Sequence, residues 1–378
     1  MSQTPLGLYL HVPFCRQRCD FCAFYLETYR DGRAGTFVDS LRREIRLYGA
    51  QDLAATHSIQ SIYFGGGTPT TLAPDQLESI LTEIRAAFVV IPEAEVSIEA
   101  HPATVSEQDL VRLVRAGFNR ISFGAESMDD REFLSIGRPG SSEDTIRAVA
   151  RACAAGFTNI NLDLMYGLPG QTLKSWRQSL DRVVQLDPAH ISCYALTIEE
   201  GTTLARNIAR EVIAAPDEVR QVEMDQTADA FLRRAGFQRY EISNYAKPGY
   251  VCRHNLLYWT NGAYLGLGPS AQSYVDGSRF GNIADLTAYN GALGEHRLPV
   301  QGYTELSDHE RLRDAVVFGL RLVQGIPTQA LEAHALHYGH RETLMGLRAQ
   351  QLIEDEGTQS RLTAKGRQYA DTVAEKLF

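Results

Sequence analysis

The first two-thirds of the chain alternates short apolar runs with stretches whose apolar residues recur every three or four positions. Runs rich in branched side chains are typical of parallel strands covered on both faces, whereas the longer spacing is typical of helices that bury one face. Helices are expected to start near Pro74 and after Ser106, which suits a helix N-cap. The pattern predicts strands over 6–12, 59–64, 95–100, 120–123, 159–165 and 190–196.

The tripeptide Ala-Gly-Phe occurs at 116–118, 155–157 and 235–237, each time between a helical stretch and an apolar run. Glycine is favoured just past a helix end because it tolerates positive φ. The third copy therefore predicts a further strand over 238–242. Serial βα units imply a parallel sheet that curls towards a barrel, with an open doubly wound sheet as the alternative. The expected fold is α/β, a partial (β/α)6-type barrel.

The pattern changes after Pro248. Residues 250–300 are rich in Gly, Asn and Tyr and show no βα rhythm. Further on, helices are predicted over 312–323, 341–352 and 364–377, with a hairpin over 353–362 that turns at Gly357. Helices beside a small hairpin indicate a smaller α+β domain with a winged-helix-like module. We therefore expect a barrel over 1–248, a connecting segment over 249–306 and a C-terminal domain over 307–378.

Charge narrows the possible partners. The chain has 37 Lys and Arg against 46 Asp and Glu, a net charge of −9, so it lacks the basic footprint of a nucleic-acid-binding protein. The predicted hairpin also begins with acidic residues, which repel phosphate. No apolar run approaches the roughly 20 residues of a membrane span. The first residues do not have the charge pattern of a signal peptide, so we expect a cytoplasmic protein.

Three of the six cysteines, Cys15, Cys19 and Cys22, lie within eight residues, at the end of the first predicted strand. Structural zinc sites usually combine two cysteine pairs, and no second pair follows. Three thiolates can instead hold three irons of a [4Fe–4S] cluster and leave the fourth iron open to a chelating ligand. The scattered Cys153, Cys193 and Cys252 are expected to be packing residues.

Other polar or flexible residues follow the predicted strands. The segment 65–70, Gly-Gly-Gly-Thr-Pro-Thr, is not a phosphate-binding Walker loop, but its glycines allow close approach of backbone to a ligand. Glu99 ends the third strand, where a carboxylate can bind a ribose or remain a solvated charge. Asp163 lies inside an apolar strand and needs a partner, for which Arg138 is the candidate.

The stretch LYLHVPFCRQRCDFC, together with these motifs in this order, resembles the HemN/HemW branch of the radical S-adenosylmethionine (SAM) superfamily over nearly the whole chain. The resemblance implies a radical SAM barrel and a [4Fe–4S] cluster on the three clustered cysteines, with an electron donor as partner. It also implies SAM as a cofactor, cleaved to a radical when the cluster is reduced. One SAM would bind at Tyr9, Gly66 and Glu99. A second would bind at Phe21, Gly67, Thr68, Glu126, Arg138, Asp163 and Ala195.

Two features place the chain within this branch. HemN members have a further cysteine two residues after the cluster motif, where this chain has Phe24, and the segment 254–259, HNLLYW, matches the H-N-x-x-Y-W of HemW members. The resemblance to HemW members implies haem as a ligand, passed to an acceptor such as a respiratory enzyme. His254 offers an axial imidazole, and Tyr258 and Trp259 offer aromatic surface. A core histidine with packing aromatics is the alternative.

A radical SAM enzyme of the HemN type is the competing function. It would decarboxylate coproporphyrinogen III oxidatively or transfer a methyl group. Phe24 argues against the decarboxylase and the H-N-x-x-Y-W segment against the methyltransferase. At one SAM position the chain departs from the family, which usually has Gln where this chain has Glu126. The resulting carboxylate changes the charge of the second SAM site.

Overall fold

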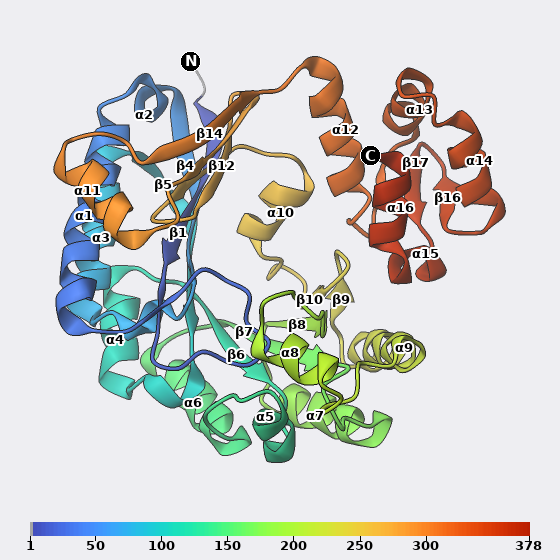
Figure 1. Cartoon of the computed structure of the whole chain (residues 1–378), viewed down its shortest axis with the longest axis horizontal. Coiled ribbons are helices and arrows are strands. Elements are labelled where there is room, and N and C mark those ends of the chain that lie inside the picture. Colours follow the sequence, from blue (N-terminus) through green and yellow to red (C-terminus); the bar gives the residue numbers. More distant parts are fainter. Residues whose placement is uncertain (1–2) are drawn as a thin grey trace.

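The computed structural model describes residues 3–378. A sheet of twelve strands in the order β14-β13-β12-β11-β1-β4-β5-β6-β7-β8-β10-β9 curves through the molecule, with helices on its outer face (Figure 1). The six central strands run parallel, and their positions confirm the six predicted strands. These strands are β1 (Thr4–Val12), β4 (His57–Gly66), β5 (Val89–Ala100), β6 (Arg120–Glu126), β7 (Asn159–Tyr166) and β8 (His190–Ala195).

The helices between these strands cover the outside of the barrel. Their apolar faces and those of the strands form one core, in which Leu6, Leu8 and Leu10 of β1 are fully buried. The helix predicted from Pro74 and the one capped by Ser106 are both present. The helices are α1 (Asp31–Gly49), α2 (Asp52–Thr56), α3 (Pro74–Ala87), α4 (Glu107–Ala116), α5 (Asp130–Ser135), α6 (Ser142–Ala155), α7 (Leu173–Gln185), α8 (Thr203–Ala209) and α9 (Glu218–Arg234), with short 3-10 turns at Pro69–Thr71 and Pro102–Thr104.

The prediction that the glycine of each Ala-Gly-Phe tripeptide ends a helix with a positive φ is confirmed. Gly117, Gly156 and Gly236 all have positive φ. The strand predicted over 238–242 is wrong. The chain instead forms β9 (Gln238–Arg239), turns, and returns as β10 (Asn244–Ala246), antiparallel to β8. The turn has a polar cause, because the Arg239 guanidinium donates to the backbone carbonyls at Glu241 and Ile242.

The predicted connecting segment contributes strands to the main sheet. Strand β11 (Tyr264–Leu267) pairs in parallel with β1, and β12 (Gln272–Val275), β13 (Ser278–Asn282) and β14 (Val300–Glu305) continue the sheet in antiparallel pairs. Helix α11 (Leu286–Gly294) packs on α1. The sequence did not predict these strands because none of them contains a continuous run of branched apolar residues. The short strands β2 (Phe14–Cys15) and β3 (Glu27–Thr28) form a separate pair.

A buried carboxylate joins this extension to the barrel. Glu44 of α1 accepts hydrogen bonds from the Gly268 N–H at 2.8 Å, the Asn282 side-chain amide at 2.6 Å and the Tyr289 hydroxyl at 2.5 Å. Burial outweighs these donors and raises the pKa of Glu44 to about 7. The folded protein therefore keeps a proton on Glu44 at a pH where the unfolded chain has lost it.

This proton gives a pH-dependent stability. Below the unfolded pKa of 4.5 the contribution of Glu44 is fully present, and it falls as the pH rises towards 7. The free energy of unfolding of the wild type should therefore drop by about 3 kcal/mol more than that of Glu44→Gln between pH 4.5 and pH 8. Urea denaturation of both proteins at the two pH values measures the difference. Parallel pH profiles would show that Glu44 is ionised in the folded state.

The C-terminal part forms a second, smaller core. Its elements run helix, strand, helix, helix, strand, strand, which is the order of a winged-helix-like module. The helix predicted over 364–377 is wrong in one respect, because it is interrupted at Tyr369, whose ψ of 27 leaves the helical range. The elements are α12 (Asp308–Gly319), β15 (Ile326–Pro327), α13 (Thr328–His337), α14 (Arg341–Ala349), β16 (Ile353–Glu356), β17 (Gln359–Leu362), α15 (Ala364–Gln368) and α16 (Ala370–Leu377).

Helix α10 (Arg253–Trp259), which carries the HNLLYW segment, lies between the barrel strands and this module (Figure 1). It contacts β4 on one side and α12 on the other. Within residues 3–378, no helix has the length and apolar character needed to cross a membrane.

Candidate cofactor site

The three clustered cysteines lie in the loop that follows β1, at the carboxyl end of the parallel strands. Each thiol is partly exposed and free. The Cys15 Sγ lies 3.3 Å from the Thr68 hydroxyl, and the Cys22 N–H donates to the Cys19 carbonyl at 3.2 Å. The guanidinium of Arg138 donates to the Cys19 Sγ at 3.6 Å. This edge of a barrel is where βα loops build active sites.

The donor set fits a cluster with an open iron. Burial raises the pKa of the Cys15 and Cys19 thiols, while the Thr68 hydroxyl lowers that of Cys15 and Arg138 lowers that of Cys19. Iron removes the proton from a coordinating thiol outright, so both groups stand ready to stabilise bound thiolates. Among residues 3–378, no three potential ligands converge on a single metal ion.

The glycine loop after β4 packs directly onto the cysteine loop. Gly66 has a φ of +107, and a Cβ there would lie 2.7 Å from the His11 ring. A Cβ on Gly67 would lie 2.6 Å from the carbonyl oxygen of Phe14. Thr68 donates its N–H to the same carbonyl at 2.7 Å. Glycine is therefore required at position 66 by the positive φ and the nearby His11 ring, and at position 67 by the close approach of the Phe14 backbone.

The structure brings together the residues predicted for the first SAM. Glu99 accepts from the Gly66 N–H at 3.2 Å and from the Tyr63 hydroxyl at 2.9 Å. Tyr9 stacks on Tyr63, with ring centroids 6.3 Å apart. Burial, reinforced by the charge of Asp163, raises the pKa of Glu99 to about 7.

Residues of the second predicted SAM site lie on the next strands. Glu126 ends β6 with a φ of 56, and its carboxylate lies 3.5 Å from the Arg138 guanidinium. Burial raises the pKa of Glu126 to about 7 despite the opposing effect of Arg138. The predicted pairing of Arg138 with Asp163 is wrong. Asp163 accepts instead from Ser122 and Asn161, each at 2.8 Å, because Asn161 lies two residues earlier on β7 and Ser122 lies opposite Asn161 on β6.

The remaining predicted residues surround this group. Phe21 is half-buried against a small apolar cluster that includes Leu196. Ala195 is exposed at the end of β8. Phe24, which stands where HemN members have a cysteine, is 65% exposed. Gly67 and Thr68 of the same predicted site lie on the glycine loop described above, beside Cys15.

Helix α10 is fixed to the barrel by Glu95 of β5. The Glu95 carboxylate accepts from the N–H groups of Arg253 at 3.1 Å and His254 at 3.2 Å. The His254 ring is buried and bonded at both nitrogens, Nδ1 to Ser61 and Nε2 to Tyr258, each at 2.9 Å. Burial lowers the pKa of His254 to about 3, so the ring is neutral.

The structure does not bring the three predicted haem residues together. His254 and Tyr258 line a cavity of about 210 Å³ inside the barrel. Trp259 lines a different cavity, of about 540 Å³, against the C-terminal module. Residues four apart on a helix share a face, whereas the next position points elsewhere. The ring of His254 is thus a satisfied core histidine in this arrangement, as the alternative interpretation had it.

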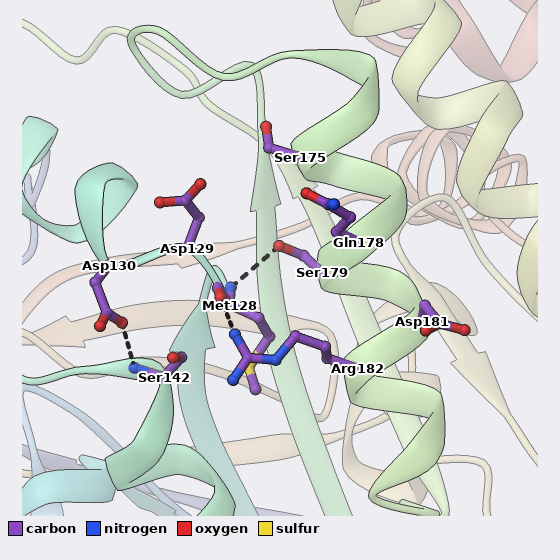
Figure 2. Close-up of a pocket in the computed structure, with 9 residues that line it drawn as sticks. All are labelled: Met128, Asp129, Asp130, Ser142, Ser175, Gln178, Ser179, Asp181 and Arg182. Carbon is purple, nitrogen blue, oxygen red and sulfur yellow. Dashed lines mark hydrogen bonds between the residues drawn. The ribbon is translucent and has the colours of Figure 1, made fainter.

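Another cavity, of about 570 Å³, lies between α5, α6 and α7 (Figure 2). None of the predicted site residues lines it. Its polar groups bond to one another: the Ser142 N–H donates to Asp130 at 2.8 Å, and Arg182 donates to the Met128 carbonyl at 2.5 Å. We assign it no role in the cofactor site.

Sequence reasoning missed Tyr63, Glu95 and Arg120, which line or support the interior of the barrel. Arg120 carried a usable signal, because it is a charge at the start of an apolar strand, just as Asp163 is a charge within one. Tyr63 and Glu95 gave none, since a tyrosine and a glutamate near a strand are ordinary.

Comparison with known proteins agrees with this geometry. Residues 9–183 match the family described as the radical SAM superfamily, and residues 306–369 match the HemN C-terminal domain. The chain is 37% identical to "Heme chaperone HemW" of Mycobacterium tuberculosis, covering 100% of this chain and 96% of that protein. It is 35% identical to "Heme chaperone HemW" of Escherichia coli, covering 72% and 70% of the two chains.

Solved structures give the same result. The structure of the Escherichia coli coproporphyrinogen III oxidase HemN, described as a radical SAM enzyme, matches with a TM-score of 0.86 and 25% identity. The match covers 99% of this chain and 90% of that one, so the α/β barrel and the C-terminal domain are shared. With the cysteine loop, the glycine loop and full-length similarity in agreement, this chain belongs to the HemW family of the radical SAM superfamily.

Proposed function

We propose that the protein is a haem chaperone, which binds haem and passes it to an acceptor protein, and that its barrel holds a [4Fe–4S] cluster and SAM. The similarity to HemW proteins over the full chain supports this function. The observation that carries it is the 540 Å³ cavity at Trp259, whose volume lies in the usual range of small-molecule sites. The six free thiols suit a reducing compartment such as the cytoplasm.

The walls of this cavity suit a flat apolar macrocycle. Trp259, Leu322 and Ile326 supply apolar surface from α10 and the C-terminal module. The Arg321 guanidinium lies over the Trp259 ring, 4.9 Å from its centroid, and pairs with Asp371 at 2.8 Å, which holds the indole against the C-terminal module. The indole Nε1 is buried and has no hydrogen-bond partner among residues 3–378. Apolar walls with a few polar groups at the rim are typical of cofactor sites.

The barrel residues have separate tasks. When bound, the cluster supplies the reductive cleavage of SAM, for which an electron donor is a further partner. Cys15, Cys19 and Cys22 would hold the cluster, and Arg138 would offset the charge of the Cys19 thiolate. As the resemblance implies, Gly66 and Glu99, which are hydrogen-bonded to each other at 3.2 Å, would bind the amino group and the ribose of one SAM. At the second site, Glu126 is ionised only near and above neutral pH.

Haem titration tests the function. The anaerobically reconstituted protein is titrated with haem while the Soret band is followed, and the same sample is assayed for coproporphyrinogen III turnover. Stoichiometric haem binding without decarboxylation supports the chaperone. Decarboxylation without haem retention would identify a HemN-type enzyme, a function favoured by the structural match to HemN. If neither occurs, a methyltransferase becomes the leading candidate.

Replacing Trp259 with alanine should weaken haem binding roughly tenfold or more, because truncating this half-buried aromatic residue removes both its contacts with the ligand and its apolar surface. Tyr303→Ala is the matched control, since Tyr303 is an exposed aromatic, 64% exposed, on β14. Equal haem affinity in both variants would move the haem site away from the cavity. His254→Ala in the same series tests the axial ligand: an unchanged Soret band would place that ligand elsewhere.

A further inference from the structure

Arg120 is a buried cation with unused hydrogen-bond donors. It opens β6 and is 1% exposed, and its Nε and Nη1 atoms are both buried with no hydrogen-bond partner in the part of the chain that the structure describes. Arginine stays charged in proteins, and a buried charge left unpaired is costly. Buried donors of this kind are rare in native folds and call for a ligand or ordered water.

The carboxylate with the largest electrostatic effect on Arg120 already accepts hydrogen bonds from other groups. Glu95 acts on Arg120 through its charge, but its oxygens accept the N–H groups of Arg253 and His254 that begin α10. Glu95 therefore fixes the helix, and its lone pairs are shared with backbone donors. The unpartnered Nε and Nη1 donors of Arg120 suit a carboxylate, which a guanidinium can bind through two parallel hydrogen bonds.

Arg120 faces the 210 Å³ cavity inside the barrel and is the one cationic residue that lines it in the described part of the chain. The neighbouring rings of His190 and His254 are neutral, since burial lowers the pKa of each below its usual range. His190 is bonded to Asn161 at 2.6 Å and to Tyr240 at 2.9 Å. The histidines therefore offer no competing charge.

Two acidic side chains also line the cavity, and both are engaged. Asp163 accepts from Ser122 and Asn161, while Glu99 accepts from Tyr63 and from the backbone of the glycine loop. Their bonds direct these oxygens to other groups. Because Glu99 and Asp163 repel a second anion, the cavity favours a ligand that carries one carboxylate and places it at Arg120.

We propose that Arg120 anchors a subsite inside the barrel for one small carboxylate group. The cavity is too small for a tetrapyrrole ring but large enough for a short chain ending in a carboxylate. The group is either a free small monocarboxylate or the carboxylate arm of a larger ligand that enters from the SAM side, where Tyr9 and Glu99 line the same cavity. This subsite goes beyond the haem cavity at Trp259, and a free carboxylate would occupy it without haem.

The first test uses the full chain, anaerobically reconstituted, with sodium propionate as probe. Propionate should raise the thermal midpoint in a saturable way, whereas propionamide, its neutral counterpart, should not, at matched ionic strength. Arg120→Met should lose this response. Arg297→Met, which removes an arginine that is 64% exposed, should keep it. A propionate response that depends on Arg120 identifies a site for a free carboxylate.

The second test compares haem with its dimethyl ester, in which both carboxylates are blocked. If an arm of the tetrapyrrole enters the subsite, haem should bind the wild type roughly tenfold or more tightly than the ester, and this preference should vanish in Arg120→Met. Should Arg120→Met fail to fold, Arg120→Lys keeps the charge without the fork and should weaken both responses.

If neither propionate nor haem gives an effect that depends on Arg120, the cavity holds only water and the proposal is overturned. Loss of haem binding altogether would contradict the chaperone function, and the propionate test would still decide the subsite.

Discussion

Replacing Cys19 with alanine is expected to abolish the iron–sulfur absorbance of the reconstituted protein and to reduce its bound iron and sulfide to background. Three thiolates hold three of the four irons of a [4Fe–4S] cluster and leave one iron open. Loss of one thiolate leaves too few ligands to retain the cluster. The substitution also removes the contact between the Cys19 Sγ and the Arg138 guanidinium at 3.6 Å, so the cluster loses a ligand and the cation beside it loses its partner. The measurement is the absorbance spectrum together with iron and sulfide analysis.

Cys153→Ala is the matched control for this experiment. Cys153 is an exposed cysteine on α6, outside the loop, and its loss should leave the cluster unchanged. A cluster spectrum retained in Cys19→Ala would mean that the ligands are misassigned. Loss of the spectrum in both variants would show that reconstitution is sensitive to any cysteine, and the assignment would then need Cys15→Ala and Cys22→Ala as well.

The second large effect concerns the buried pair of Glu126 and Arg138. Their side chains are 13% and 9% exposed and lie 3.5 Å apart. Arg138→Ala leaves Glu126 buried without its counter-charge, and breaking such a pair costs about 3–5 kcal/mol of unfolding free energy. The loss should be greatest at pH 8, where the carboxylate is ionised, and smaller at pH 5, where Glu126 takes up a proton.

The double variant Arg138→Ala/Glu126→Gln separates charge from packing. Because it removes the unpaired carboxylate, it should recover most of the lost stability at pH 8. Urea denaturation of the wild type and both variants at the two pH values measures this recovery. Arg131→Ala is the surface control: Arg131 pairs with Asp129 but is 87% exposed, so its loss should change stability by less than about 1 kcal/mol. Equal stability of the single and double variants would show that Glu126 does not depend on Arg138.

Much of the barrel could be predicted because its strands are continuous apolar runs in the sequence. The run at 159–165, for example, is buried on both faces and is found within one residue of its observed end at Tyr166. The later strands, such as β11 with four residues, carry no such pattern, since their pairing with β1 is decided by tertiary contact. Antiparallel strands β9 and β10 were missed because the turn depends on Arg239 contacts that sequence does not show.

The site divides in the same way. The cysteine loop and the glycine loop follow from short motifs whose spacing is itself the signal. The partner of Asp163 could not be derived from the sequence, because its carboxylate reaches Ser122, which lies diagonally across from it on β6, and this neighbour depends on the strand register. Helical geometry alone could have predicted that His254 and Trp259 are separated, because residues five positions apart on a helix lie on different faces. What the sequence could not show is that both sides of that helix border cavities.

The pairing of β11 with β1 has a consequence for synthesis of the chain. Gly7 lies opposite Tyr264, so one edge of the first strand stays uncovered until more than two-thirds of the protein has left the ribosome. An uncovered apolar strand edge invites pairing with other chains, and long-range pairings of this kind form slowly. The nascent barrel should therefore depend on molecular chaperones during translation, and fragments that stop before residue 264 should aggregate.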